Sequence, residues 1–200
     1  RNHNIHLVVL GDGRERKNVE KMVHDMNLSH KISFLGAFPL DKMPYFFNKA
    51  DALLISLKKS NIFSKTIPAK TQAYLAFGKP ILTNSQGEVS NIINESKSGL
   101  TSDSGNYMLL AENMLKLSLL SDNEKKVMSD NAKKYYQMCA DNNYGNGAEM
   151  FTSMIRVVNA KNGGANEESL AVIEAGKKKF PSDYTLNVEE FNYWYAKGEN

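Results

Sequence analysis

Short apolar runs that alternate with amphipathic segments are the feature that most constrains how this chain can fold. The runs at residues 5–10, 31–35, 51–57 and 80–82 have the length of strands, and helical patterns separate them. Mostly apolar runs of this length are typical of strands covered on both faces, which occur mainly in parallel sheets. The alternation therefore predicts βαβ units and an α/β fold, with a parallel sheet flanked by helices.

The loops that follow these strands are expected at one edge of the sheet, because the carboxyl ends of parallel strands meet there and ligands bind there. The segments predicted at this edge are Gly11–Gly13, Gly36–Phe38, Ser56–Lys59 and Thr66–Lys70. The first of them, a Gly-rich turn between a strand and a helix, begins a Rossmann-like unit. Taken alone it is a weak signal. In one interpretation the turn lets a phosphate approach the backbone, with Arg14 nearby. In the other it is only the tight turn that joins the strand to the helix.

The stretch Phe63–Leu82 carries the most specific local signal. Pro68 suits a first helical turn, Thr66 can cap that helix, and Gly78 ends it before a buried strand. Lys70 falls in the first turn, where a cation opposes the helix dipole. An anion docked at this helix end would explain the lysine, because unpaired N–H groups, the dipole and the ammonium would all face it. A phosphate group fits that description.

The run PAKTQAYLAFGKPIL, which begins at Pro68, resembles the donor-binding segment of bacterial retaining glycosyltransferases with two Rossmann domains. The resemblance is to the family 4-like subgroup of amino-sugar transferases, which build capsule, O-antigen and exopolysaccharide, and it includes the Gly87-Glu88 loop that follows. It covers residues 4–158. The Glu-x7-Glu pair usual in the family is absent, because Lys65 and Ala73 stand at that spacing, so the ribose contact has no assigned residue.

The resemblance implies a site for a nucleotide diphosphate sugar, with UDP as the family-based choice of carrier and with no cofactor or metal. Lys70 and Glu88 are the expected catalytic residues. Lys70 would neutralise the diphosphate, and Glu88 would accept hydrogen bonds from sugar or ribose hydroxyls, although it can equally cap a helix. The expected substrate-binding residues are Gly11, Gly13, Arg14, Gly36, Phe38, Lys58, Thr66, Gln72 and Gly87.

The resemblance also implies a polysaccharide or lipid-linked acceptor, held by a separate N-terminal Rossmann domain. This chain opens without Met, directly before a predicted strand. We therefore expect an excised fragment of a longer protein, which binds the donor but transfers little or no sugar alone.

Two domains are predicted: a nucleotide-sugar-binding domain at 1–158 and a helical segment at 159–200. In the second, helices at 167–180 and 184–197 flank Pro181-Ser182-Asp183. That turn, and the 34 positions between Gly164 and Gly198, are similar to a tetratricopeptide repeat, which would bind a protein partner. An ordinary helical hairpin explains them equally well. The expected packing face of the last helix consists of Val188, Phe191, Trp194 and Tyr195.

Charge and cysteine content limit which other functions this chain can have. The net charge of +3 is too mild to indicate nucleic-acid binding. The single cysteine, Cys139, excludes an internal disulfide and fits a reducing compartment, so we expect a cytoplasmic protein, with peripheral attachment to the inner face of the membrane compatible with its charge. Two other functions stay open: a non-catalytic interaction module that uses the C-terminal helices, and a nucleotide-sugar epimerase. The scattered positions of the histidines argue modestly against the epimerase and against a metal site; they are His3, His6, His24 and His30.

Overall fold

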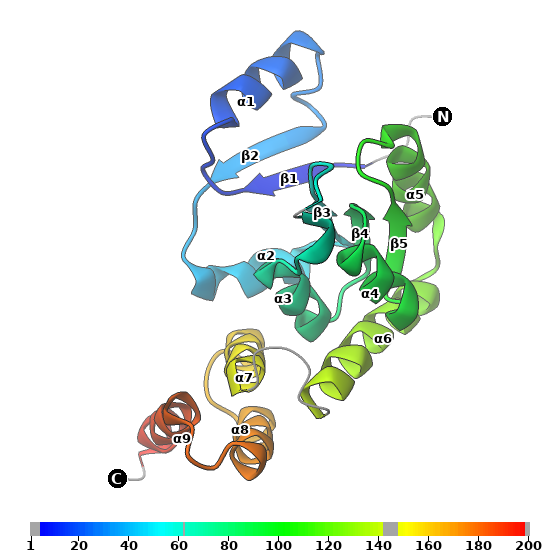
Figure 1. Ribbon diagram of the computed structural model, residues 1–200. Coiled ribbons are helices and arrows are strands. Elements are labelled where there is room, and N and C mark those ends of the chain that lie inside the picture. Colours follow the sequence, from blue (N-terminus) through cyan, green and yellow to red (C-terminus); the bar gives the residue numbers. More distant parts are fainter. Residues whose placement is uncertain (1–4, 62, 142–147, 199–200) are drawn as a thin grey trace. The chain divides into compact units, whose positions relative to one another are not determined.

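The computed structural model describes residues 5–61, 63–141 and 148–198 (Figure 1). The chain divides into two compact units, residues 1–43 and 44–200. Both units have parallel strands joined through helices, and the second continues into a set of C-terminal helices. The α/β class expected from the alternating sequence pattern is confirmed.

The first unit is one βαβ segment followed by a 3-10 turn. Its elements are β1 (Leu7–Leu10), α1 (Arg16–Asp25), β2 (Ile32–Gly36) and the 3-10 helix η1 (Leu40–Lys42). β1 and β2 are parallel, and a shift of register after Val9 brings Leu10 opposite Gly36. The two strands therefore end side by side. On α1 only Val23 is buried, whereas Met22 and Met26 of the same apolar stripe are exposed.

The second unit contains a three-stranded parallel sheet in the order β3-β4-β5. Its elements up to the last strand are α2 (Met43–Lys49), β3 (Leu53–Ser56), η2 (Phe63–Lys65), α3 (Ala69–Phe77), β4 (Ile81–Asn84), α4 (Glu88–Ser96) and β5 (Gly99–Ser102). The strands are in register, so that Ser56, Asn84 and Ser102 form one row at their carboxyl ends. All four residues of β4 are buried, as expected for a central strand.

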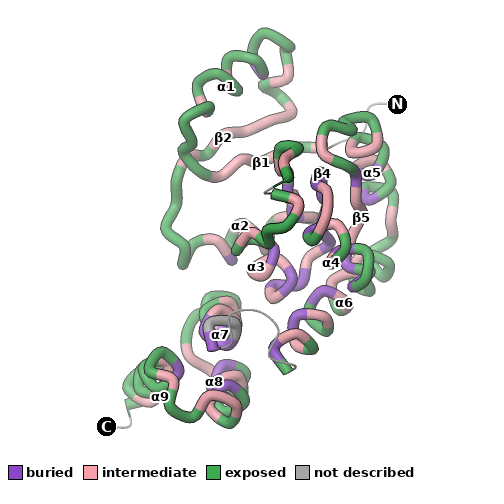
Figure 2. The backbone as a smooth tube through the Cα atoms, in the orientation of Figure 1, coloured by how far each residue is buried: buried purple, intermediate pink, exposed green. Residues whose placement is uncertain are grey.

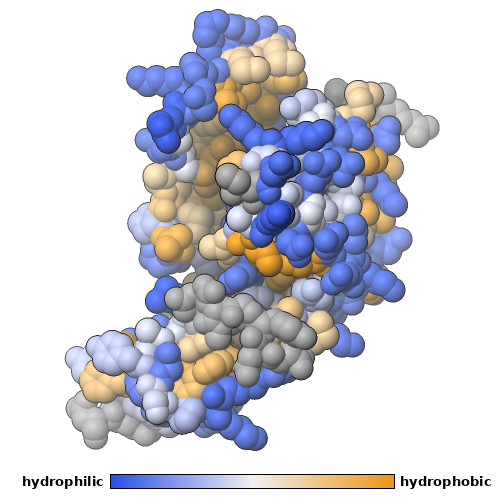
Figure 3. Space-filling model, viewed as in Figure 1, coloured by the Kyte–Doolittle hydropathy of each residue, from blue (hydrophilic) through white to orange (hydrophobic). Residues whose placement is uncertain are grey.

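In the described residues, five helices follow the sheet. They are α5 (Tyr107–Leu119), α6 (Asp122–Asp141), α7 (Ala148–Asn162), α8 (Glu167–Lys179) and α9 (Tyr184–Lys197). α4 and α5 both pack against β4 and β5, while α6 and α7 pack against α3. Ala132, Tyr136 and Ala140 are buried on α6 at a spacing of four residues, which gives the helix one buried face (Figure 2). In the view of Figure 3, hydrophilic side chains occupy much of the surface, and a hydrophobic band lies among them near α3 and α4.

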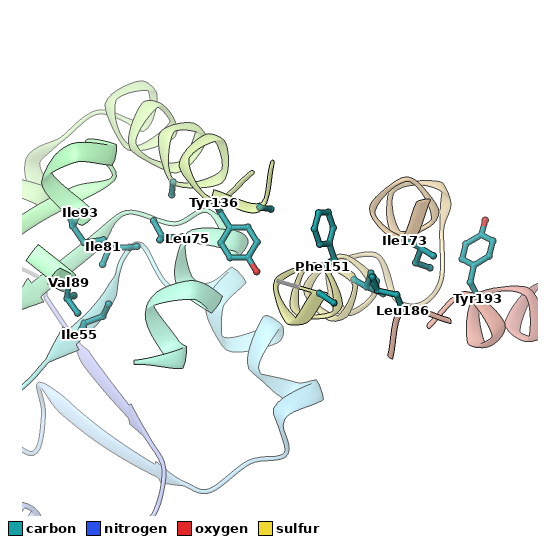
Figure 4. Close-up of a cluster of buried hydrophobic side chains, with 14 residues drawn as sticks. Ile55, Leu75, Ile81, Val89, Ile93, Tyr136, Phe151, Ile173, Leu186 and Tyr193 are labelled. Carbon is teal, nitrogen blue, oxygen red and sulfur yellow. The ribbon is translucent and has the colours of Figure 1, made fainter. Parts of the chain in front are cut away.

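One cluster of buried side chains runs through the second unit (Figure 4). It begins at Ile55 and Ile81 on the sheet and passes through Tyr136 on α6 to the C-terminal helices. Its members there are Ala148, Phe151, Ile155, Ile173, Leu186 and Tyr193. α8 approaches α7 and α9 at Gly176, where an added Cβ would meet Phe151 at 2.9 Å and Leu186 at 3.0 Å. The C-terminal helices thus share the hydrophobic core of the sheet.

The packing face predicted for α9 is wrong at Val188, Phe191 and Tyr195, which are exposed, whereas Trp194 packs against the core as expected. Phe191 and Tyr195 are 67% and 68% exposed, and their rings stack on each other at the surface. Leu186 and Tyr193 are the buried residues of this helix instead. Apolar and aromatic residues occur on both sides of α9, so the sequence predicted the helix but not which side packs on α7 and α8.

Candidate functional site

Polar loops meet at the carboxyl edge of the β3-β4-β5 sheet. The row Ser56, Asn84 and Ser102 ends the three strands, and the loops at 57–68, 85–87 and 103–106 begin there. A small hollow lies among these loops, lined by Leu57, Lys58, Ser60, Phe63, Ser64, Gln86 and Ser104. Its space is about 150 Å³ with the part open to solvent included. Pockets for small-molecule ligands are usually about 300 Å³ or larger, so this hollow is no more than one part of such a site.

The loop after β3 and the start of α4 touch at Gly87. This glycine has φ +78° and ψ −139°, a conformation that side chains rarely allow. The backbone carbonyl of Ser64, in η2, fills the space that a Cβ on Gly87 would need. Glu88 is the first residue of α4, directly after this contact. The close approach therefore fixes the position of Glu88 relative to the hollow.

Glu88 does not cap α4 through its side chain. Gly87 occupies the N-cap position, and no side chain accepts a hydrogen bond from the first turn. The Glu88 carboxylate is exposed and, among the described residues, has no hydrogen bond or ion pair. Its place in the first turn favours a negative charge. The side chain is therefore available to a ligand.

The start of α3 has the features expected for an anion site, with one correction. Pro68 is the N-cap residue, one position before the helix, and Lys70 is the second helical residue. The predicted cap by Thr66 is wrong, because its hydroxyl donates to the carbonyl of Phe63 at 3.3 Å. The 3-10 turn η2 draws Thr66 back toward Phe63. The N–H groups of Ala69 and Lys70 consequently have no partner within the described part of the chain.

The Lys70 side chain is exposed and makes no ion pair with any residue that the structure describes. No acidic residue lies in the first turn of α3 to offset its charge. Lys58 is also exposed and lines the hollow, while Gln72 is half-buried on α3. The next residue of the first turn, Thr71, is fully buried, and its hydroxyl has no partner among the described residues.

In the first unit the two glycine turns lie together. The N–H of Gly11 donates to the carbonyl of Gly36 at 2.7 Å, so the ends of β1 and β2 are joined. Gly13 accepts a hydrogen bond from the N–H of Arg16 at 3.0 Å. Arg14 and Phe38 are exposed. The predicted site residues thus fall into two groups, one in each compact unit. The first unit contains Gly11, Gly13, Arg14, Gly36 and Phe38. The second unit contains Lys58, Thr66, Lys70, Gln72, Gly87 and Glu88.

Arg16 is the residue that sequence reasoning missed in the first unit. A Cβ at Gly36 would lie 3.2 Å from its Nη1, so the guanidinium covers the end of β2. Arg16 pairs with Glu20 at 2.7 Å and with Asp12 at 3.8 Å, and its hydrogen bond to Glu20 raises its pKa. The sequence did contain a sign of these ion pairs, because Asp12, Arg16 and Glu20 are spaced four residues apart, the spacing at which charged side chains on a helix meet.

Residues 1–135 match the family described as "Glycosyl transferases group 1". The chain belongs to this family of glycosyltransferases. The match covers both units as far as α6 and includes all the residues predicted for the site. The parallel sheet with its flanking helices is consistent with one half of the two-domain fold that the resemblance implied.

The chain is also similar to the uncharacterized glycosyltransferase MJ1178 of Methanocaldococcus jannaschii. The two are 25% identical over 127 residues, which are 64% of this chain and 34% of that protein. The chain thus spans about a third of the length of this glycosyltransferase relative. Within the described residues, no helix is both long and apolar enough to cross a bilayer. No three His, Cys, Asp or Glu side chains of those residues lie close enough to hold a metal ion.

Proposed function

We propose that this chain supplies the donor site of a retaining glycosyltransferase that uses a nucleotide diphosphate sugar, with UDP as carrier. The observation that carries the proposal is the start of α3. An unpaired lysine stands in a helical turn whose first N–H groups lack partners, on a helix with no acidic residue to offset the charge. A cation in this place is unfavourable for the isolated helix and favourable for a bound diphosphate.

The chemistry follows from where charge grows during sugar transfer. When the bond between the sugar carbon and the diphosphate oxygen breaks, negative charge builds on the leaving diphosphate. Fixed donors and a cation next to that charge stabilise the transition state more than the ground state. Lys70 and the first N–H groups of α3 are assigned this role, with Lys58 steering the diphosphate from the hollow.

Glu88 is assigned to the hydroxyl groups of the donor. A carboxylate accepts two hydrogen bonds from neighbouring hydroxyls, and Glu88 is exposed and unpaired in the described part of the chain. The Ser64–Gly87 contact holds the backbone from which it projects. Taken by itself, the first unit keeps Gly11, Gly13 and Gly36 as predicted substrate-binding residues, because glycine turns allow a ligand to approach the backbone closely.

The transferred sugar is proposed to be a hexose or an N-acetylamino sugar, and the acceptor a polysaccharide or lipid-linked glycan of the capsule or O-antigen type. The support is the motif of residues 68–82 together with Gly87-Glu88. Acceptor binding is proposed to need a further Rossmann domain. The chain alone should therefore bind the donor nucleotide and transfer little or no sugar.

Isothermal titration calorimetry tests the proposal. UDP, GDP and ADP are titrated into the chain and into its Lys70→Ala variant. We expect heat of binding with at least one nucleotide, largest with UDP, and much weaker binding in the variant. Absence of heat with all three nucleotides, or equal affinity in the variant, would refute the assignment of the site.

A further inference from the structure

The side chain of Asn84 is the most highly connected polar group at the carboxyl edge of the sheet. Its Nδ2 donates to Ser102 Oγ at 3.1 Å, to the carbonyl of Asp103 at 2.9 Å and to that of Asn106 at 3.5 Å. Its Oδ1 accepts from the N–H of Gly105 at 3.2 Å. Asn84 is only 2% exposed, and both ends of its amide are used. One buried side chain thus holds the whole loop at 103–106.

That loop in turn holds the end of β3. Ser104 Oγ donates to the carbonyl of Leu57 at 3.0 Å, across 47 positions of sequence. The N–H of Leu57 donates to the backbone carbonyl of Asn84 at 2.9 Å. Leu57 is therefore held at both backbone groups: its N–H by the backbone of Asn84, and its carbonyl by Ser104, whose loop the Asn84 side chain holds. Leu57 and Ser104 line the hollow, and so does Lys58, the residue after Leu57.

We infer that Asn84 is a positioning residue of the donor site, which rests on the function proposed above. It acts by holding the loop at 103–106, through which Ser104 fixes Leu57 and the backbone that carries Lys58. Asn84 lies at the bottom of the loops rather than in the hollow and is not assigned a contact with the donor. Its effect on ligand affinity passes through Ser104.

Two variants break this connection at different points. Asn84→Asp keeps the oxygen that accepts from Gly105 but places a second oxygen against the carbonyls of Asp103 and Asn106, so the loop is released. Ser104→Ala removes only the hydrogen bond to Leu57. The matched control is Asn113→Asp. Asn113 is 9% exposed on α5 and donates through Nδ2 to the carbonyl of Thr101 at 2.9 Å, away from the hollow.

UDP affinity by calorimetry, thermal unfolding and amide hydrogen exchange are measured on all three variants and the wild type. Asn84→Asp and Ser104→Ala should each weaken UDP binding by about tenfold, the size of one lost hydrogen bond. Amide exchange at residues 57–60 should rise in both. Asn113→Asp should lower the unfolding temperature but leave UDP affinity and exchange at residues 57–60 as in the wild type.

The inference is overturned if Ser104→Ala binds UDP as the wild type does, or if Asn113→Asp weakens binding as much as Asn84→Asp. If the proposed function itself is wrong, the result differs from both of these, because the wild type then binds no nucleotide. In that case exchange at residues 57–60 still decides whether Asn84 controls this loop: unchanged exchange in Asn84→Asp and Ser104→Ala refutes the connection, and increased exchange in both supports it.

Discussion

The backbone carbonyl of Ser64 occupies the space that a side chain on Gly87 would need. This relationship joins two loops that are 23 positions apart in the chain, and it sets where α4 begins. Ser64 lines the hollow, and Glu88 follows Gly87 directly in the chain. A change at Gly87 should therefore disturb both the hollow and the position of the Glu88 carboxylate.

Gly87→Ala should destabilise the protein by about 3 kcal/mol or more, since backbone strain of this type costs ~1–3 kcal/mol and the overlap with Ser64 adds to it. Urea unfolding measures the loss. The control is Gly105→Ala, because Gly105 also has a positive φ of +86° but a Cβ there has no atom within 4 Å. The control therefore reports strain without overlap. Equal losses in the two variants would contradict the close contact.

Lys70→Gln should weaken UDP binding and leave the fold as stable as before or slightly more stable. Removing a cation from the first turn of a helix relieves an unfavourable dipole interaction of about 0.3–1 kcal/mol. The same substitution at Lys59, which is exposed and unpaired within the described residues, is the control for loss of charge. Calorimetry and urea unfolding are measured together. A loss of stability in Lys70→Gln would show that the lysine has a structural partner.

The sequence predicted the elements of this fold well wherever the apolar period was regular. α3 ends as expected at Gly78, which has φ +72° in the left-handed region and suits a helix C-terminus. The loop before α3 was harder to predict. Residues 63–65 form a 3-10 turn, and this turn, rather than local preference, directs the Thr66 hydroxyl to Phe63. Competing local hydrogen bonds of this kind are not visible in residue types alone.

Parts of the candidate site depended on contacts between distant segments. Asn84 was not among the residues predicted, because a polar residue at a strand end gives no sign that four hydrogen bonds converge on it. Gly87 was predicted from its motif, but the reason for glycine there is the Ser64 carbonyl. Lys70 was predicted from an electrostatic argument that needs only the helix start, and its exposed, unpaired state in the described part of the chain agrees with that argument.

The N-terminus of α9 should lose stability in acid because of Asp183. Its carboxylate accepts hydrogen bonds from the Thr185 hydroxyl and the Leu186 N–H, and these lower its pKa from 3.8. A lowered pKa means that the stabilisation is complete above the unfolded-state value and disappears as pH falls through the folded-state value. The window is therefore below pH 3.8.

Urea unfolding of the wild type and Asp183→Asn at pH 6 and pH 3 checks this expectation. Asn caps a helix as Asp does but does not titrate. The wild type should lose more stability than the variant between the two pH values. Thr185→Val removes the largest cause of the shift, so it should reduce the difference. Identical acid sensitivity in the wild type and Asp183→Asn would exclude this role of Asp183.

Gly176→Ala should destabilise the C-terminal helices even though Gly is a poor residue within a helix. Alanine in a helix interior is favoured over glycine by about 0.5–1 kcal/mol, but overpacking a core costs about 1–3 kcal/mol. A Cβ at Gly176 would meet Phe151 at 2.9 Å and Leu186 at 3.0 Å, both of which are fully buried. We therefore expect a net loss of about 1 kcal/mol by urea unfolding.

Two further variants separate the opposing terms at Gly176. Ala175→Gly, at the exposed neighbouring position of α8, measures the helix preference alone. Leu186→Val shortens the side chain whose Cδ2 atom lies near Gly176, so Gly176→Ala should cost less in that background. If Gly176→Ala instead stabilises the protein by as much as Ala175→Gly destabilises it, the close approach of α8 to Phe151 and Leu186 at Gly176 is contradicted.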